Sequence, residues 1–221
     1  MKSPRISVLV ATADRPRLLS GCLESLASSS FASAEVLVLD QSREPAEPSA
    51  GAWQGSDLEL RHVRCPRRGK SAALNLGIAQ AVQNAGRIAL LNDDALPPPH
   101  WLEALGDTLD RDPRLAAVQG TLTDAGGRVV DGRGITFDRW ALPVQVDRGL
   151  PATGEDRTLR PVLAVSGTAA LWRTEALAAA STGAIAPFDP AFGSYHEDLD
   201  LGLRLRRLGW RSAWVGGAPV R

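Results

Sequence analysis

Residues 87–94, RIALLNDD, are a short apolar run that ends directly in an amide and two carboxylates. A nearly continuous apolar run of this length predicts a strand that is buried on both faces, as in a parallel sheet. Two adjacent carboxylates cannot both enter an apolar core without a large cost, so Asp93 and Asp94 are expected at the rim of the sheet. The cluster indicates either a site for a hard cation such as Mg²⁺ or Mn²⁺, or a solvated acidic turn before the next helix.

Strand and helix signals alternate on both sides of this stretch. Further strands are predicted over residues 6–11, 35–40, 58–63 and 115–118, and helices from Arg15, over 71–85 and from Pro97. This alternation predicts an α/β fold with a mostly parallel central sheet that is flanked by helices. Residues 41–57 are rich in Pro, Ser, Gly and Glu and are expected to form a loop.

The second half of the sequence has a different character. Residues 120–161 are rich in Gly, Asp, Arg and Thr, which predicts short antiparallel strands and loops. The remaining expected elements are a strand, turn and strand over 162–173, a helix over 174–180, a helix over 195–208 and a strand over 212–215. No linker is evident, so we expect a single domain over 1–221 with two unequal halves, 1–96 and 97–221, the second with mixed and antiparallel strands.

Composition excludes several classes of protein. The 221 residues include 25 basic and 25 acidic side chains, and this zero net charge argues against a general nucleic-acid binder. A hydrophobic share of 44% excludes wholesale disorder, and no apolar run approaches the ~18–20 residues of a transmembrane segment. Two cysteines are too few for a disulfide scaffold, so Cys22 and Cys65 are expected to be half-buried thiols in a cytoplasmic protein.

Polar side chains follow three of the predicted strands. They are residues 12–15 (TADR), Asp40, and residues 92–94 (NDD). Ligands of open parallel sheets bind at the carboxyl ends of the strands, so we expect these side chains to share one rim and to face a substrate there.

Residues 61–70 form a dense basic stretch. Its arginines and Lys70, with Gly69, could hold phosphates just before a helix, or they could form a solvated loop. Gly69-Lys70-Ser71 resembles the end of a P-loop, but Arg64 stands where that motif requires glycine, so a P-loop NTPase is disfavoured.

Residues 194–200, SYHEDLD, place three carboxylates at the start of a predicted helix. Ser194 and Glu197 have the spacing of a capping box, which explains Glu197 without a chemical role. Asp198 is explained only in part by the helix dipole, and a carboxylate there could act as a general base toward a hydroxyl nucleophile. His196 is the alternative base.

In their order along the chain, these motifs resemble those of a family 2 glycosyltransferase with the GT-A fold. Five segments carry the resemblance, which spans nearly the whole chain: residues 6–15, 38–42, 69–77, 91–97 and 195–201. The resemblance implies an inverting enzyme that moves a hexose or deoxyhexose from a nucleoside diphosphate sugar to an acceptor hydroxyl, with Mn²⁺ or Mg²⁺ as cofactor. It also implies a glycan, lipid-linked or small-molecule acceptor in cell-surface polysaccharide synthesis, and a cytoplasmic location or a peripheral one at the inner face of the membrane.

The resemblance further implies roles for individual residues. The donor would be bound by Thr12, Asp14, Arg15, Asp40, Gly69, Lys70, Asn75 and Asp93. Asp94, together with Asn92, would bind the metal. Asp198, in a Glu-Asp motif with Glu197, would take the proton of the acceptor hydroxyl.

Two departures from the family pattern leave other functions open. Asn92 replaces the first acid of the common Asp-Asp-Asp form, and no histidine metal ligand follows Trp214. One alternative is therefore a sugar-nucleotide or glycan-binding module without turnover. Another is a nucleotidyltransferase, which also uses paired acids on an α/β sheet.

Overall fold

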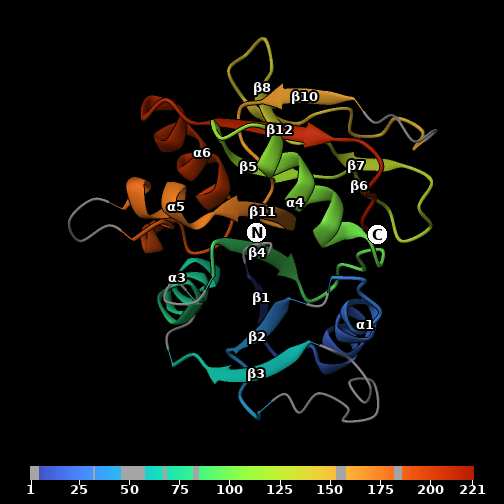
Figure 1. Cartoon of the computed structure of the whole chain (residues 1–221), viewed down its shortest axis with the longest axis vertical. Coiled ribbons are helices and arrows are strands. Elements are labelled where there is room, and N and C mark those ends of the chain that lie inside the picture. Colours follow the sequence, from blue (N-terminus) through green and yellow to red (C-terminus); the bar gives the residue numbers. More distant parts are fainter. Residues whose placement is uncertain are drawn as a thin grey trace.

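The computed structural model describes residues 5–31, 33–45, 58–66, 69–81, 85–152, 158–181 and 186–221. Eight strands form one sheet in the order β10-β12-β5-β11-β4-β1-β2-β3 (Figure 1). Their bounds are β1 Ile6–Thr12, β2 Ala34–Asp40, β3 Glu59–Arg64, β4 Arg87–Asn92, β5 Leu115–Gln119, β10 Leu159–Val162, β11 Ala169–Arg173 and β12 Arg211–Val215. Two small hairpin pairs are added by β6 Leu122–Thr123 with β7 Val130–Gly132, and β8 Ile135–Phe137 with β9 Pro143–Gln145.

The sheet has a parallel part and a mixed part. Strands β1, β2, β3 and β4 are parallel to one another, whereas β11 runs antiparallel to both β4 and β5. Strand β12 is parallel to β5, and β10 closes that edge in the antiparallel direction. The expected α/β class and mostly parallel central sheet are confirmed.

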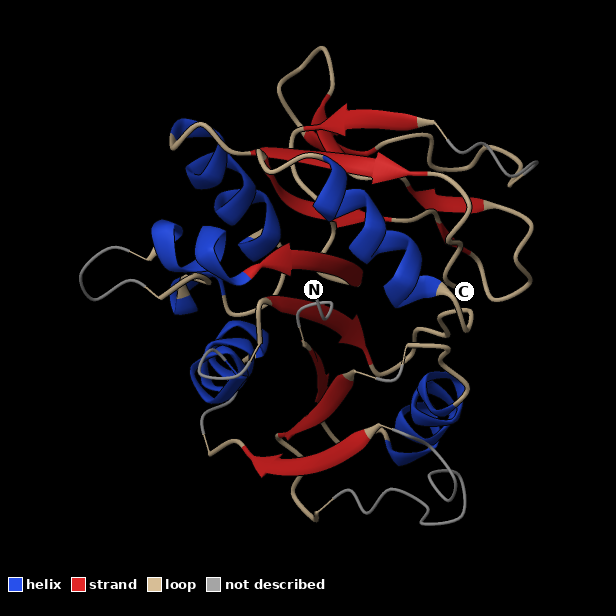
Figure 2. Cartoon of the chain, viewed as in Figure 1, coloured by secondary structure: helices blue, strands red, loops and turns tan. Residues whose placement is uncertain are grey.

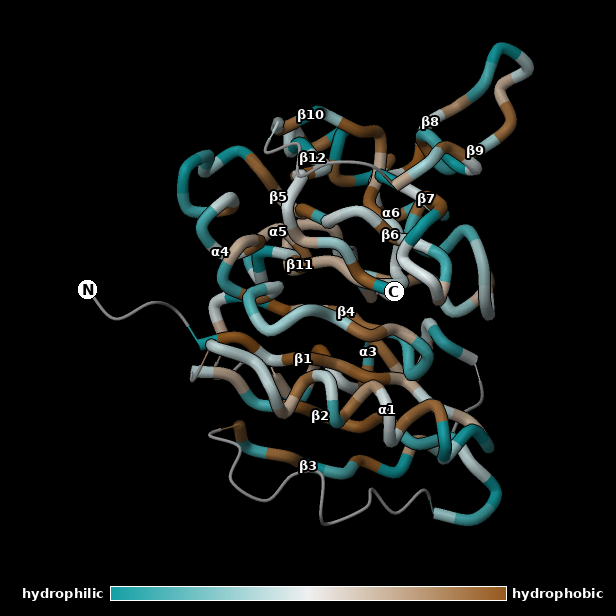
Figure 3. Tube along the Cα trace, turned by 90° about the vertical axis from the view of Figure 1, so that its right-hand side faces the viewer, coloured by the Kyte–Doolittle hydropathy of each residue, from teal (hydrophilic) through white to brown (hydrophobic). Residues whose placement is uncertain are grey.

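Helices cover both faces of this sheet (Figure 2). They are α1 Pro16–Ala27, α3 Lys70–Ala81, α4 Trp101–Arg111, α5 Thr174–Ala180 and α6 Glu197–Arg207, with a short 3₁₀ helix, η1, at Pro190–Phe192. One core packs α1 and α4 against the sheet, and a second core packs α3, α5 and α6 against the other face. Side chains of one strand enter both cores, because neighbouring residues of a strand point to opposite faces: Val36 joins the first core and Leu37 the second. This explains the continuous apolar runs of the central strands, which lie in the middle of the molecule in Figure 3.

The parallel register brings three polar strand ends together. Thr12, the last residue of β1, pairs with Asp40 of β2, and Ala11 pairs with Asn92 of β4. The expected common rim of the sheet is therefore confirmed.

Several element predictions were wrong in detail. The helix expected over 71–85 is described from Lys70 to Ala81, residues 82–84 lie outside the described part, and Ala85 is not helical. The helix expected from Pro97 begins at Trp101. Of the loop expected over 41–57, residues 46–57 lie outside the described part.

The strand, turn and strand expected over 162–173 is not a hairpin. Strand β10 ends at Val162 and pairs with β12, whereas β11 pairs with β4 and β5. The two strands lie far apart in the sheet order because the segment between them crosses from its edge to its middle. Local sequence carries no information on such a crossover.

The capping box expected at Ser194 and Glu197 is also wrong. Helix α6 begins at Glu197, its N-cap is His196 in the left-handed conformation (φ 67°), and the N-cap makes no side-chain cap. Tyr195 has a positive φ as well, so two consecutive residues turn the chain sharply into the helix. Glu197 therefore does not form a capping box with Ser194 in this structure.

The expectation that the two thiols are half-buried is wrong, because both side chains lie in the core. Cys22 and Cys65 are free and buried, and burial raises the pKa of Cys65 to about 11. None of the described helices has the length and apolar composition that crossing a membrane requires.

Candidate active site

A cleft with a volume of about 950 Å³ lies along the polar rim of the sheet. Strand ends and the start of α3 form one side of it, and the hairpin β8–β9, the turn at Gly167 and the start of α6 form the other. Eight of the residues expected in the site line this cleft, and they are Thr12, Arg15, Gly69, Lys70, Asn92, Asp93, Glu197 and Asp198. Segments that are more than 100 residues apart in sequence thus meet at one place.

The carboxylate of Asp93 is buried at the floor of the cleft. Its two oxygens accept hydrogen bonds from the Thr12 hydroxyl at 2.7 Å and from Arg15 Nη1 at 2.8 Å. Burial raises the pKa of Asp93, and the hydroxyl and the guanidinium oppose that rise. The site thus holds a carboxylate whose charge is only partly balanced.

Arg15 joins the two acids of the rim. Its Nη2 donates to Asp94 Oδ2 at 2.8 Å while Nη1 engages Asp93. The carboxylate of Asp94 is exposed and raises the pKa of Arg15 further above its ordinary value. One guanidinium therefore spans both carboxylates in a forked geometry that suits arginine.

Lys70 connects the two sides of the cleft. Its Nζ donates to Asn92 Oδ1 at 2.8 Å and to the Gly167 carbonyl at 3.1 Å, and it lies 3.8 Å from Glu197 Oε1. The Asn92 amide oxygen and Lys70 thus pair on one wall, and Lys70 reaches Gly167 and Glu197 of the other wall. The other oxygen of Glu197, Oε2, is buried and has no hydrogen-bond partner among the described residues. A buried polar atom of this kind is stabilised when a ligand supplies the missing donor.

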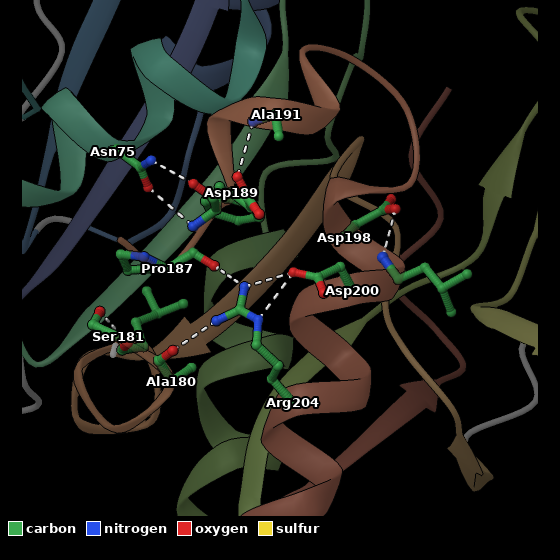
Figure 4. Close-up of polar contacts among 12 residues, drawn as sticks. Asn75, Ala180, Ser181, Pro187, Asp189, Ala191, Asp198, Asp200 and Arg204 are labelled. Carbon is green, nitrogen blue, oxygen red and sulfur yellow. Dashed lines mark hydrogen bonds and ion pairs between the residues drawn. The ribbon is translucent and has the colours of Figure 1, made fainter. Parts of the chain in front are cut away.

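Asp198 is held by two backbone amides. Its Oδ2 accepts from the Gly167 N–H at 2.9 Å, and its Oδ1 accepts from the Leu199 N–H at 2.8 Å. Each oxygen keeps a second lone pair, so the carboxylate is oriented without being saturated. Figure 4 shows Asp198 at the start of α6, which Arg204 anchors further along through Asp200 and through the carbonyls of Ala180 and Pro187.

Four expected site residues do not line the cleft. Asp14 has a positive φ and bonds to Ser42 and Arg43 beside the rim, and the fully buried Asp40 is held by Arg64 Nη1 at 2.6 Å. Asp94 lies at the margin with Arg15. The Asn75 side chain points to the backbone of Phe188 instead (Figure 4). Its Nδ2 donates a hydrogen bond to the Phe188 carbonyl, and its Oδ1 accepts one from the Phe188 amide.

The basic stretch 61–70 is divided between two roles. Arg61 lies on β3 and pairs with Glu35, and Arg64 pairs with Asp40, so both neutralise acids of β2. Arg67 and Arg68 lie outside the described residues. Lys70 is the cation of this stretch that lines the cleft.

Sequence reasoning missed most of the cleft wall that faces the rim. It consists of Ile135, Pro143, Val144, Gln145, Asp131 and Arg148, and of Ser166 and Thr168 beside the Gly167 turn. These residues come from segment 120–161, whose sequence pattern is weak, and from the crossover between β10 and β11. Neither segment has a local sequence pattern that indicates a site.

The rim fits a hard divalent cation in its chemistry. Asp93 and Asp94 supply carboxylate oxygens and Asn92 supplies an amide oxygen, which are ligand types that Mg²⁺ and Mn²⁺ accept. No group of three or more His, Cys, Asp and Glu side chains is gathered as a metal centre in the described part of the chain. A cation held here would therefore take its remaining ligands from substrate phosphate and water, as Mg²⁺ commonly does.

The chain is similar in sequence to known glycosyltransferases. A family model described as "Glycosyltransferase like family 2" matches residues 4–221. An N-acetylglucosaminyl-diphospho-decaprenol L-rhamnosyltransferase of Mycobacterium tuberculosis is 27% identical over 224 residues, which cover 90% of this chain and 69% of that protein. The O-antigen biosynthesis protein RfbC of Myxococcus xanthus is 29% identical over 223 residues, covering 95% of this chain and 16% of that protein.

The fold has counterparts among solved structures. A crystal structure of GalNAc-T7 with UDP, GalNAc and Mn²⁺ superposes with a TM-score of 0.73 at 14% identity, covering 98% of this chain and 42% of that one. This similarity confirms the GT-A architecture. The chain spans less than half of that structure.

Proposed function

Because the chain belongs to the glycosyltransferase-like family 2, we propose that it transfers a sugar from a nucleoside diphosphate sugar to an acceptor hydroxyl with inversion at the anomeric carbon. One observation carries this proposal: Asp93 at the end of β4 and Asp198 at the start of α6 face the same cleft. The first belongs to an acidic rim suited to a cation and a diphosphate, and the second is an oriented carboxylate suited to proton removal.

The donor side of the cleft would be formed by the rim. Asp94 and Asn92 would hold Mn²⁺ or Mg²⁺, which when bound supplies positive charge to the diphosphate. Thr12, Arg15 and Asp93 would contact the donor, and Gly69 and Lys70 would lie beside it. The positions of Asp14 and Asp40 next to the rim support a role near the nucleoside, and Asn75 would support this wall through Phe188.

The acceptor side would be formed by the start of α6. Asp198 takes the proton of the acceptor hydroxyl while that oxygen bonds to the anomeric carbon. The bond from the anomeric carbon to the diphosphate oxygen breaks on the opposite face, and the diphosphate leaves with the electron pair. The amides of Gly167 and Leu199 keep the Asp198 carboxylate in place during this transfer, and Glu197 Oε2 is available to a substrate hydroxyl.

The relatives support a class of substrates. The name of the mycobacterial relative specifies a rhamnosyl donor and a lipid-linked diphosphate acceptor, and that of the Myxococcus relative specifies O-antigen synthesis. We therefore propose a hexosyl or deoxyhexosyl donor and a glycan or lipid-linked acceptor in cell-surface polysaccharide synthesis. The GalNAc-T7 structure, which contains UDP and Mn²⁺, supports a nucleotide sugar and a divalent cation.

The test is a comparison of two aspartate variants of α6. Sugar transfer or donor hydrolysis is measured with a panel of nucleotide sugars and Mn²⁺, for wild type, Asp198→Asn and Asp200→Asn. We expect Asp198→Asn to lower turnover about 10²–10⁴-fold, the usual cost of losing a general base, with donor affinity kept. Asp200 pairs with Arg204 on the same helix and does not line the cleft, so Asp200→Asn is expected to stay within a few-fold of wild type.

The same assay separates the alternatives. Turnover of Asp198→Asn within a few-fold of wild type would contradict the base assignment. Donor binding by the wild type without any turnover would favour a binding module. Release of pyrophosphate in place of a nucleoside diphosphate would indicate a nucleotidyltransferase.

A further inference from the structure

The hairpin β8–β9 carries a cluster of exposed apolar side chains that the proposed chemistry does not use. Trp140 is 70% exposed and Leu142 59% exposed, and Phe137 and Val144 are exposed beside them. We call these four residues the apolar tip. The hairpin projects beyond the body of the protein at the side of the sheet where the strands end (Figure 3). Large apolar side chains that gather on one exposed segment indicate an interaction site.

The apolar tip is presented by a well-bonded turn. Asp138 Oδ1 accepts hydrogen bonds from the backbone amides of Trp140 at 2.8 Å and Leu142 at 2.9 Å, and the Asp138 amide donates to the Leu142 carbonyl at 2.9 Å. Ala141 adopts a positive φ (59°), which closes the turn. The exposed side chains thus have a defined backbone beneath them, so little conformational entropy is lost when they bind.

The chemistry of the tip is that of a membrane interface. The guanidinium of Arg139 lies over the Trp140 ring, 4.9 Å from its centroid. Tryptophan prefers the interface between water and lipid, where its amphipathic ring sits at headgroup level. A cation beside it can reach lipid phosphates while the ring and Leu142 enter the acyl boundary.

A basic hollow of about 580 Å³ lies beside the tip. It is bordered by Phe137 and contains three arginines, Arg133, Arg160 and Arg206, against one acid, Asp147. Arg133 and Arg160 both lie over the Trp214 ring, at 5.1 and 4.9 Å from its centroid, so their positions are well defined. The excess of positive charge next to an apolar tip complements a surface of anionic lipid.

The hairpin also forms part of the candidate active site. Pro143, Val144 and Gln145 of β9 line the cleft, whereas Thr136 and Phe137 of β8 line the basic hollow. The hairpin therefore separates the cleft from the hollow. A membrane that is bound by the tip would lie close to the acceptor side of the cleft.

We propose that the apolar tip inserts into the interface of an anionic lipid bilayer, with Arg139 and the basic hollow on the lipid phosphates. This contact brings the acceptor side of the cleft to the membrane surface, where a lipid-linked acceptor would be presented. That last consequence rests on the proposed function, whereas the membrane contact itself does not.

Vesicle co-sedimentation tests the proposal without any substrate. Wild type, Trp140→Ser/Leu142→Ser and Leu18→Ser are mixed with vesicles of phosphatidylcholine alone or with about one third phosphatidylglycerol. Leu18 is an apolar residue on α1, 43% exposed and away from the hairpin, and serves as the control. We expect the wild type and Leu18→Ser to bind the anionic vesicles. The double variant is expected to bind them at least about tenfold more weakly.

A charge variant tests the basic hollow. Arg206→Glu is expected to reduce the preference for anionic over neutral vesicles, and added salt is expected to weaken wild-type binding in the same way. Undiminished vesicle binding by the double variant, or no binding by the wild type, would overturn the proposal. Light scattering that detects a wild-type dimer, lost in the double variant, would instead assign the tip to a second copy of the chain.

Donor hydrolysis is measured as a second readout, which shows whether the double variant is still folded and active. Donor hydrolysis by the double variant is expected to stay within a few-fold of wild type, because Trp140 and Leu142 do not line the cleft. If the wild type binds vesicles but has no transferase activity, the membrane contact stands and the proposed function fails. If the wild type transfers sugar but does not bind vesicles, the proposed function stands and the membrane contact fails.

Discussion

At the level of single residues, Asp93 lies where burial and charge oppose each other. The carboxyl is almost fully buried, yet it neighbours a second carboxyl, that of Asp94. Thr12 and Arg15 compensate only in part, because the pKa of Asp93 remains raised. Such an arrangement costs folding stability and is typical of a site that gains its missing partner from a ligand.

Replacing Asp93 by asparagine should therefore stabilise the fold. In the window between the ordinary pKa of an aspartate and the raised pKa of Asp93, the unfolded chain releases this proton while the folded chain keeps it. Stability of the wild type therefore falls as the pH rises through that window, and Asp93→Asn lacks this loss. We expect a higher melting temperature for Asp93→Asn at pH 7, with each kcal/mol worth about 2–4 °C.

Melting curves between pH 4 and pH 8 check this prediction. The advantage of Asp93→Asn should grow as the pH rises and should shrink toward zero at the acidic end. The exposed neighbour offers the control, and Asp94→Asn is expected to change the melting temperature less. A lower melting temperature for Asp93→Asn at pH 7 would mean that the Arg15 ion pair outweighs burial.

At the level of elements, the site depends on contacts that hold α3 and α6 in place. The Asn75 side chain of α3 donates to the Phe188 carbonyl at 2.6 Å and accepts from the Phe188 amide at 3.0 Å. Arg204 of α6 bonds to the Pro187 carbonyl next to it. The segment at 187–188 is therefore held by both helices that border the cleft, with Lys70 at the start of one and Asp198 at the start of the other.

Loss of the Asn75 amide should loosen this arrangement. Asn75→Ala leaves the backbone amide and carbonyl of the buried Phe188 without these partners, which should destabilise the fold by about 1–3 kcal/mol. Urea unfolding in the absence of donor measures the change, and Gln80→Ala, at an exposed position on the same helix, should be close to neutral. Unchanged stability together with a raised KM for the donor would instead favour the direct donor role that the family resemblance implies for Asn75.

At the level of the whole molecule, zero net charge conceals a concentration of charge at the cleft. Acids gather at the end of β4 and the start of α6, and the cations Arg15 and Lys70 lie directly beside them. Strands of the one eight-stranded sheet lead into both sides of the cleft, so the two sides share one support. This layout suits a ligand that carries both a cation and a diphosphate.

Binding of such a ligand should stabilise the whole fold. At a concentration of 100 Kd, a nucleoside diphosphate with Mn²⁺ should add about 2.7 kcal/mol to the free energy of unfolding. Thermal-shift measurements with and without Mn²⁺ test this for a panel of nucleoside diphosphates. Asp94→Ala should abolish the Mn²⁺-dependent part, whereas Asp107→Ala, at an exposed position on α4, should retain it. A full Mn²⁺-dependent shift in Asp94→Ala would contradict the assignment of Asp94 as a metal ligand.

Periodicity and apolar runs alone are sufficient to predict β1, β2, β4 and α5, because these depend on neighbours within one strand or helix. The common rim needs one further rule, that ligands of an open parallel sheet bind at the carboxyl ends of its strands. The carboxylates of the rim and of α6 were found for the same reason, as acids placed directly against apolar segments. The start of α6 was predicted wrongly, because two left-handed residues and not the Ser194 side chain begin the helix.

The tertiary structure alone decided which groups meet. The bond from Gly167 to Asp198, the contacts of Lys70 across the cleft and the turn of Asn75 toward Phe188 all join residues that are distant in sequence. The apolar tip and most of the cleft wall that faces the rim come from residues 131–148, whose pattern is too weak to predict their place. Local sequence determines which segments form strands and helices, whereas the crossovers of the sheet determine which of their ends form a site.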